Sequence, residues 1–118
     1  MEKLILLVDD SLFMRTWLKK TISEQIDIQF IEAANGKEAI EMYTKFSPHV
    51  VLMDITMPKL SGIESLKEII KIDSQATIIM CTSLGSKMLV TEAIQSGAKD
   101  FIVKPHFHNL IPILRKFI

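Results

Sequence analysis

Short, almost entirely apolar runs recur along the chain, and each ends on polar residues. Runs that are apolar on both faces are typical of buried parallel strands. Four such runs with their polar endings are Lys3–Val8 before Asp9-Asp10, His49–Met53 before Asp54, Ala76–Cys81 before Thr82-Ser83, and Phe101–Val103 before Lys104-Pro105. A fifth segment, Asp27–Glu32, alternates apolar and polar residues, which favours a strand at the edge of a sheet.

Between these runs, apolar residues recur three or four positions apart, which predicts helices. The predicted helices span Ser11–Gln25, Asn35 to about Ser47, Leu60–Ile72, Ser86–Ser96 and Asn109–Phe117. Ser11 is a candidate N-cap, Gly97 is a candidate left-handed C-cap, and Pro112 fits because it falls in a first turn. The residues predicted on the inner faces of the first and fourth helices are Phe13, Met14, Trp17, Leu18, Ile22, Leu89, Val90, Ala93 and Ile94.

Strand and helix therefore alternate five times with short connections. This order predicts an α/β fold, a doubly wound parallel sheet with right-handed crossovers and helices on both faces. We expect residues 1–118 to form one domain, because a chain of 118 residues has room for one core. Ligands of such sheets bind at the carboxyl ends of the strands, where the strand order reverses. The polar endings of the runs should therefore meet in one shallow crevice.

Composition limits the class of protein but not its chemistry. Lys+Arg and Asp+Glu are 14 each, and no basic stripe suggests nucleic-acid binding. The apolar runs are far shorter than the roughly 20 residues of a membrane span, and the N-terminus lacks a signal-peptide layout. Cys81, the only cysteine, lies within an apolar run, so we expect a buried, inert thiol. These features predict a cytoplasmic protein without a membrane or nucleic-acid partner.

Three carboxylates, a hydroxyl and an ammonium group are predicted to converge at the crevice. Taken singly, each has a structural explanation: Asp9 and Asp10 as helix-capping acids, Asp54 as a turn residue, and Lys104 as a solvated charge. Taken together they need cations, because like charges about 4 Å apart repel by about 4 kcal/mol at an effective dielectric constant of roughly 20. Lys104 supplies one charge, and a divalent metal would supply the rest.

Oxygen ligands from a few carboxylates favour Mg²⁺ over Zn²⁺, and no Cys/His set has zinc spacing. A carboxylate beside such a metal is equipped to attack phosphorus and form an acyl phosphate. Asp54 is the best nucleophile candidate because it ends the central strand, whereas Asp9 and Asp10 suit metal binding. Lys104 would offset the charge on the transferring group, and Thr82 would donate to a phosphoryl oxygen.

Four segments carry a resemblance to a known family. They are Val8–Ser11 (VDDS), Met53–Pro58 (MDITMP), Cys81–Ser83 (CTS) and Gly97–Pro105 (GAKDFIVKP). As a set they resemble the receiver domains of response regulators, especially the stand-alone chemotaxis regulators, and the resemblance runs from Lys3 to about Phe117. It implies a flavodoxin-like (βα)5 domain with a five-stranded parallel sheet in the order 2-1-3-4-5.

The resemblance also implies a phosphorylation site. Asp54 would accept a phosphoryl group from the phosphohistidine of a sensor histidine kinase. Asp10, Asp54 and the backbone carbonyl of Thr56 would ligate Mg²⁺, with Asp9 acting largely through water. Beyond this self-phosphorylation and self-dephosphorylation, the chain is not expected to be an enzyme.

A switch is implied by the same resemblance. Lys104 would contact the phosphoryl group, Thr82 would move toward it, and the ring of Phe101 would fill the space that Thr82 leaves. The alternative for Phe101 is an ordinary core aromatic.

The Lys104-Pro105 peptide bond is expected to be cis. An apolar Leu84 would hinder the attacking water, which predicts slow self-dephosphorylation.

The output and two rival functions stay open. No DNA-binding or catalytic domain is expected after Phe117, so we expect output through a protein partner, such as a flagellar motor switch component or a phosphatase, and a monomeric protein. A phosphorelay intermediate that passes the phosphoryl group to a second histidine protein is the alternative. An aspartate-dependent phosphohydrolase is disfavoured because Thr56 replaces the second acid of its Asp-x-Asp motif. A pseudo-receiver would keep the fold without the chemistry.

The loop after Lys104 contains two histidines and an aromatic residue. His106, Phe107 and His108 should lie near the docking surface. They would either tune the choice of partner or, for the histidines, be solvated loop residues.

Overall fold

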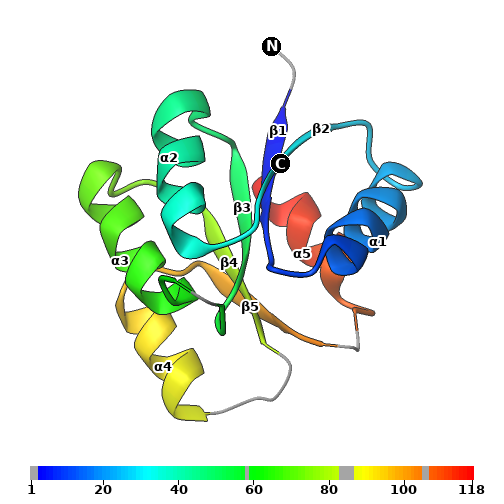
Figure 1. The fold of residues 1–118 in the computed structure, drawn as a ribbon. Helices are drawn as coiled ribbons and strands as arrows, with labels where there is room; N and C mark the ends of the chain where they lie inside the picture. The colour runs from blue at the N-terminus through cyan, green and yellow to red at the C-terminus, as the bar shows by residue number, and fades with distance from the viewer. Residues whose placement is uncertain (1–2, 58, 83–86, 105–106) are drawn as a thin grey trace.

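The structure, a computed structural model, describes residues 3–57, 59–82, 87–104 and 107–118. In the described residues strand and helix alternate five times, as predicted (Figure 1). The elements are β1 Leu4–Val8, α1 Leu12–Ser23, β2 Gln29–Ala33, α2 Gly36–Phe46, β3 Val50–Asp54, α3 Gly62–Ile72, β4 Ile78–Thr82, α4 Lys87–Gln95, β5 Asp100–Val103 and α5 Leu110–Phe117. No helix of the described part is long and apolar enough to cross a membrane.

The sheet confirms the predicted order and direction of the strands. Its order is β2-β1-β3-β4-β5, and every neighbouring pair is parallel. Chain order reverses at β1, which pairs with β2 on one side and β3 on the other. Val8 lies opposite Met53, so Asp9 and Asp54 follow at the same level. The carboxyl ends of β1 and β3 therefore form the switch point of this fold.

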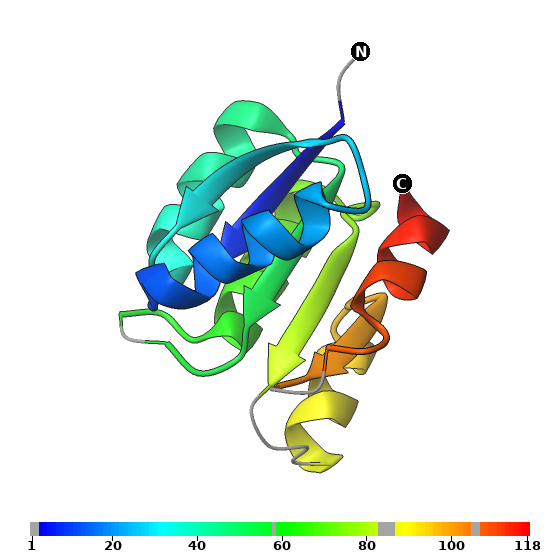
Figure 2. The same cartoon turned by 90° about the vertical axis from the view of Figure 1, so that its right-hand side faces the viewer.

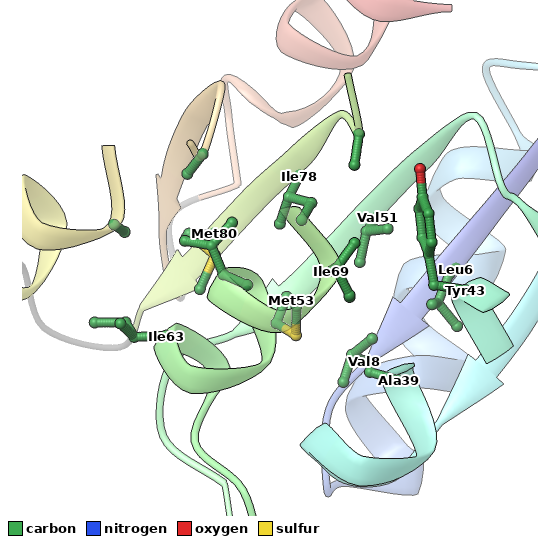
Figure 3. Packing of buried hydrophobic residues seen from close by; sticks show 14 of the residues in the cluster. Leu6, Val8, Ala39, Tyr43, Val51, Met53, Ile63, Ile69, Ile78 and Met80 are labelled. Carbon is green, nitrogen blue, oxygen red and sulfur yellow. The ribbon is translucent and has the colours of Figure 1, made fainter. Parts of the chain in front are cut away.

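Helices cover both faces of the sheet, as Figure 2 shows. Successive strand residues point to opposite faces, so each central strand contributes to two cores. One core joins the strands to α2 and α3, and Figure 3 shows its central side chains. Its members include Leu6, Val8, Val51, Met53, Met80, Tyr43, Leu66 and Ile69. The other core, against α1 and α5, includes Ile5, Leu7, Leu52, Ile79, Leu18, Ile22, Leu110 and Leu114.

Several local predictions are confirmed. The Ser11 hydroxyl accepts a hydrogen bond from the Met14 backbone N–H at 3.1 Å and caps α1. Gly97, with φ of 117°, takes the positive φ that follows α4. Pro112 lies in the first turn of α5, and β2 is an edge strand. Cys81 is buried, and burial raises the pKa of its thiol to about 12, which keeps it protonated and unreactive at neutral pH.

The predicted inner faces of α1 and α4 are wrong in part. Phe13 is 76% exposed, Trp17 and Leu89 are each 37% exposed, and Ile94 is 43% exposed. In α1 the buried residues are Leu18 and Ile22, four positions apart, and Phe13 lies about 140° around the helix from Leu18. Ala93 is the buried residue of α4 among those described. A helix that packs on one face of a sheet buries only a strip of its surface, and periodicity does not give the width of that strip.

Candidate functional site

The three predicted carboxylates converge at the carboxyl ends of β1 and β3. Asp9, Asp10 and Asp54 each offer an oxygen atom, and these atoms lie within 4.8 Å of one another. The Asp9 side chain is buried, that of Asp54 is 13% exposed, and Asp10 is exposed. One parallel register explains the meeting, because Asp9 directly follows β1 and Asp54 ends the neighbouring β3.

Lys104 brings a positive charge into this cluster. Its Nζ lies 2.6 Å from Asp9 Oδ2 and 3.4 Å from Asp54 Oδ2, and its side chain is 13% exposed. Burial works against the charged form of Lys104, but the hydrogen bond to Asp9 and the charges of the two carboxylates raise its pKa above the usual value. Lysine therefore stays protonated between the carboxylates and offsets part of their repulsion.

Asp9 is held from several sides. Its Oδ1 accepts a hydrogen bond from the Ser11 backbone N–H at 2.9 Å, while Oδ2 accepts from Lys104. Its own backbone N–H donates to the Ala33 carbonyl at the end of β2, at 3.1 Å. Because both carboxylate oxygens already have protein donors, Asp9 organises the cluster and orients Lys104.

The position of Asp54 destabilises the ionised form of its carboxyl group. Desolvation by burial raises the pKa of Asp54 above its ordinary value, and the nearby charge of Asp9 adds to the rise. The charge of Lys104 and hydrogen bonds from the Thr56 backbone and the Lys104 side chain work in the opposite direction without cancelling it. The ionised carboxylate at this position therefore gains from a further cation.

Asp54→Asn is expected to make the metal-free protein more stable than the wild type at neutral pH. Because the folded-state pKa of Asp54 is raised, the folded protein binds its proton more tightly than the unfolded chain does, and ionisation lowers the free energy of unfolding. The advantage of asparagine should be small near the unfolded-state pKa of about 4. It should grow as pH rises through the folded-state pKa, then level off. Urea unfolding of both proteins in EDTA across this range measures it, and an advantage that shrinks with rising pH would contradict the assignment.

Thr82 and Phe101 lie on the neighbouring strands β4 and β5, of which β4 pairs with the strand that carries Asp54. Thr82 ends β4 and is 6% exposed, and its carbonyl accepts a hydrogen bond from the Lys104 backbone N–H at 2.6 Å. Phe101 lies on β5 opposite Met80 and is 37% exposed. Phe101 is therefore not an ordinary core aromatic. Its ring lies at the surface, on the strand next to that of Thr82.

Some predicted positions are not part of this picture. Leu84 and His106 lie outside the described residues, and so does Pro105, whose peptide bond with Lys104 was expected to be cis. Phe107 packs its ring against Trp17 of α1, with ring centroids 4.8 Å apart. His108 is exposed, in agreement with a solvated loop residue.

Two further residues of the site, Arg15 and Gly62, were not predicted from the sequence. Arg15 Nη1 donates to the Asp9 carbonyl at 2.6 Å, and its Nε pairs with Glu32 Oε1 at 2.9 Å. Gly62 lies so close to the Asp54 carbonyl that a Cβ atom there would be 2.0 Å from the oxygen. The only sequence signal for Arg15 was its place in the helix that begins at the site, and nothing in the residue pattern marked Gly62.

Comparison with known proteins decides the family. The family model named response regulator receiver domain matches residues 5–115 of this chain. The chain belongs to the response regulator receiver domain family. This receiver domain is 51% identical over 105 residues to the chemotaxis protein CheY of Thermotoga maritima, covering 89% of this chain and 88% of that protein. It is 52% identical over 101 residues to the chemotaxis protein CheY of Bacillus subtilis, covering 86% and 84%.

Solved structures agree with the family. The receiver domain is similar to a chain in the crystal structure of the CheX–CheY–BeF3–Mg²⁺ complex from Borrelia burgdorferi, with a TM-score of 0.87 and 37% identity, covering 98% of this chain and 90% of that one. The protein is thus a CheY-like response regulator.

The donor set at the site fits a small, hard dication. Asp9, Asp10 and Asp54 supply only carboxylate oxygens, and oxygen is the ligand that Mg²⁺ prefers. Lys104 sets one positive charge against three carboxylates, so a dication would offset the repulsion that remains among them. Thr56 lies two residues after the end of β3, which brings its backbone carbonyl to the same edge of the sheet.

Proposed function

We propose that the protein is phosphorylated on Asp54 in a Mg²⁺-dependent reaction, with the phosphohistidine of a sensor histidine kinase as donor. The observation that supports this most strongly is the meeting of Asp9, Asp10, Asp54 and Lys104 at one switch point of the sheet. Bound Mg²⁺ would be held by Asp10, Asp54 and the Thr56 carbonyl, with Asp9 acting through water. It would supply charge to a transferring phosphoryl group.

In the proposed reaction, one carboxylate oxygen of Asp54 attacks the phosphorus atom of phosphohistidine. A P–O bond forms as the P–N bond breaks, and the electron pair of the broken bond returns to the imidazole nitrogen. A proton already on the other ring nitrogen lets the ring leave as neutral imidazole. Asp54 thereby becomes an acyl phosphate. Its raised pKa makes the carboxylate a somewhat better nucleophile than an ordinary aspartate once it is ionised.

Lys104 and Thr82 are proposed to stabilise the transferred group. The Lys104 ammonium already lies 3.4 Å from Asp54 Oδ2, so a small shift brings it to a phosphoryl oxygen. The Thr82 hydroxyl, at the end of the neighbouring β4, would donate to another oxygen. Both contacts become stronger as negative charge collects on the phosphoryl group.

The proposed readout is a change in the surface formed by α4, β5 and α5. Phosphorylation adds close to two negative charges. A shift of Thr82 toward that charge would open space for the Phe101 ring, which now lies partly exposed. Met88, 84% exposed, and Leu89 and Ile94 of α4 add apolar area to the same region. An apolar surface that repacks with a local charge is suited to binding a protein partner.

The relatives guide the choice of pathway. Curated relatives at about half identity carry the name chemotaxis protein CheY, and one similar structure is a complex of CheX with CheY. We therefore propose a cytoplasmic, monomeric regulator whose partners are a histidine kinase and either a flagellar motor switch component or a phosphatase. It would turn over no substrate beyond its own phosphoryl group.

A mass measurement tests the chemistry. Incubation with Mg²⁺ and a small acyl phosphate should add one phosphoryl mass to the wild type and none to Asp54→Asn. Asp27→Asn, at an exposed carboxylate away from the site, serves as the matched control and should gain the mass normally. EDTA should prevent the gain. Phosphorylation of Asp54→Asn to the wild-type extent would sink the assignment of the nucleophile.

A further inference from the structure

Arg15 links the edge of the sheet to the backbone of the acidic cluster. Its side chain is 14% exposed, so its guanidinium has given up most of its water. In exchange, Nε donates to Glu32 Oε1 at 2.9 Å, and Nη1 donates to the Asp9 carbonyl at 2.6 Å. The Asp9 carbonyl belongs to the peptide unit that joins Asp9 to Asp10, which connects the two acids of the cluster.

We propose that Arg15 is a positioning residue for the metal site, an inference that rests on the proposed binding of Mg²⁺. The Asp9 N–H is already fixed by the Ala33 carbonyl, and the Asp9 carboxylate by Ser11 and Lys104. Arg15 fixes the remaining side, the Asp9 carbonyl. With that peptide plane held, the Asp10 Cα is fixed in place, and the Asp10 carboxylate has an oxygen within 4.8 Å of the oxygens that Asp9 and Asp54 offer.

Glu32 makes this arrangement compatible with cation binding. An unpaired guanidinium beside the cluster would repel a dication. Glu32 on β2 accepts from Arg15 and also from Lys19, whose Nζ lies 2.9 Å from Oε2. Partial burial acts to raise the pKa of Glu32, but hydrogen bonds and charges from Lys19 and Arg15 outweigh it and lower the pKa. Glu32 is therefore ionised and holds the guanidinium at the carbonyl.

A plain helix-to-strand ion pair is the competing explanation. Lys19 makes such a pair with the same Glu32, and its side chain is 37% exposed. Arg15 differs because its planar guanidinium has several N–H donors in fixed geometry, so it donates to the Glu32 carboxylate and to the Asp9 carbonyl at the same time. Lys19 is thus a matched control that loses a cation from Glu32 without a hydrogen bond to the Asp9 carbonyl.

The sign of the effect on Mg²⁺ affinity separates positioning from simple electrostatics. Removing a cation near the site should by charge alone tighten binding of Mg²⁺. Loss of a group that orients metal ligands typically weakens metal binding by about 10- to 100-fold. We expect Arg15→Gln to raise the Kd for Mg²⁺ by about 10-fold. Arg15→Lys keeps the positive charge but loses the planar guanidinium that donates to two acceptors, so it should also raise the Kd for Mg²⁺. Lys19→Gln should leave this Kd within about twofold of the wild-type value.

Calorimetric titration of MgCl2 into the four proteins gives the Kd values, with thermal unfolding to check that each variant is folded. The ¹⁵N chemical shift of the Asp10 amide, which shares the peptide unit with the Asp9 carbonyl, should move in both Arg15 variants and stay in Lys19→Gln. If Arg15→Gln does not fold, Arg15→Lys carries the same comparison. Equal or tighter Mg²⁺ binding in the folded Arg15 variants would overturn the assignment.

The experiments also distinguish failure of the positioning role of Arg15 from failure of the proposed phosphorylation. Weakened Mg²⁺ binding in the Arg15 variants, together with a wild type that gains no phosphoryl mass, would support positioning while removing the phosphorylation proposal. The reverse pattern, normal phosphorylation with equal Kd values, would overturn positioning alone. A wild type that binds no Mg²⁺ would overturn both.

Discussion

Lys104→Met is expected to slow phosphorylation by a small acyl phosphate by about 100-fold, since removal of one preorganised donor costs about 10² to 10³ in rate. Methionine keeps an unbranched side chain but has no charge to place near the phosphoryl oxygens. The variant also leaves the carboxylates of Asp9 and Asp54 without the cation that now lies 2.6 and 3.4 Å away. The rate of mass gain in saturating Mg²⁺ measures the first effect.

The free energy of unfolding of Lys104→Met provides a second, independent measurement of the role of Lys104. Breaking a largely buried ion pair by removing one partner costs about 3 kcal/mol or more when the remaining charge stays buried. Asp9 keeps its hydrogen bond from Ser11, so in EDTA we expect Lys104→Met to lower the free energy of unfolding by somewhat less, about 2 kcal/mol. Mg²⁺ should return part of the loss by supplying charge to the cluster.

Lys99→Met is the matched control, because Lys99 is an exposed lysine directly before β5. It should phosphorylate at the wild-type rate and unfold at the wild-type urea concentration. A wild-type rate in Lys104→Met would show that the ammonium group takes no part in transfer, whatever its distance from Asp54.

The principal residues of the site could be predicted because strand ends are visible in the sequence. Asp9, Asp54, Thr82 and Lys104 are the first polar positions after four apolar runs. In a parallel sheet those positions share one edge, so the residue pattern alone brings them together. The hydrogen bonds among them follow from this placement.

Contacts that depend on the depth of packing were beyond the sequence. Periodicity gives the direction of a helical side chain and not how far its neighbours cover it, so Phe13 and Leu89 were wrongly expected to face inward. Trp17 finds its aromatic partner, Phe107, ninety positions later in the chain, through the docking of a loop that no local pattern describes. Arg15 was missed for a related reason, since its role depends on how closely α1 approaches the end of β1.

Gly62→Ala is the second change with a large expected effect, and two opposing terms decide its sign. Gly62 is the first residue of α3, after the N-cap Ser61. Alanine forms helix better than glycine by up to about 1 kcal/mol. Against this, a Cβ atom at Gly62 would lie 2.0 Å from the Asp54 carbonyl oxygen and 2.8 Å from the Ile55 Cα. Overpacking costs about 1–3 kcal/mol even where side chains can adjust, and here the obstacles are backbone atoms.

The clash should therefore win, with a net loss of about 2 kcal/mol or more. The Gly62 N–H also donates to the Ile55 carbonyl at 2.8 Å, which ties α3 to the segment that follows Asp54. To relieve the clash, either α3 moves away or the Asp54 backbone shifts. Both moves disturb the carboxylate, so Gly62→Ala should weaken Mg²⁺ binding as well as lower the melting temperature, by about 10 °C.

Gly97→Ala separates the two consequences. Gly97 has φ of 117°, where alanine is strained, and its nearest neighbours are side-chain atoms of Ile70, remote in the fold from the carboxylates. This variant should lose stability but bind Mg²⁺ with the wild-type Kd at a temperature where it is folded. If the two glycine variants lose stability equally and both keep the wild-type Kd, then the contact between Gly62 and Asp54 stabilises the fold only. A raised Kd confined to Gly62→Ala would instead mean that the start of α3 sets the position of the Asp54 carboxylate.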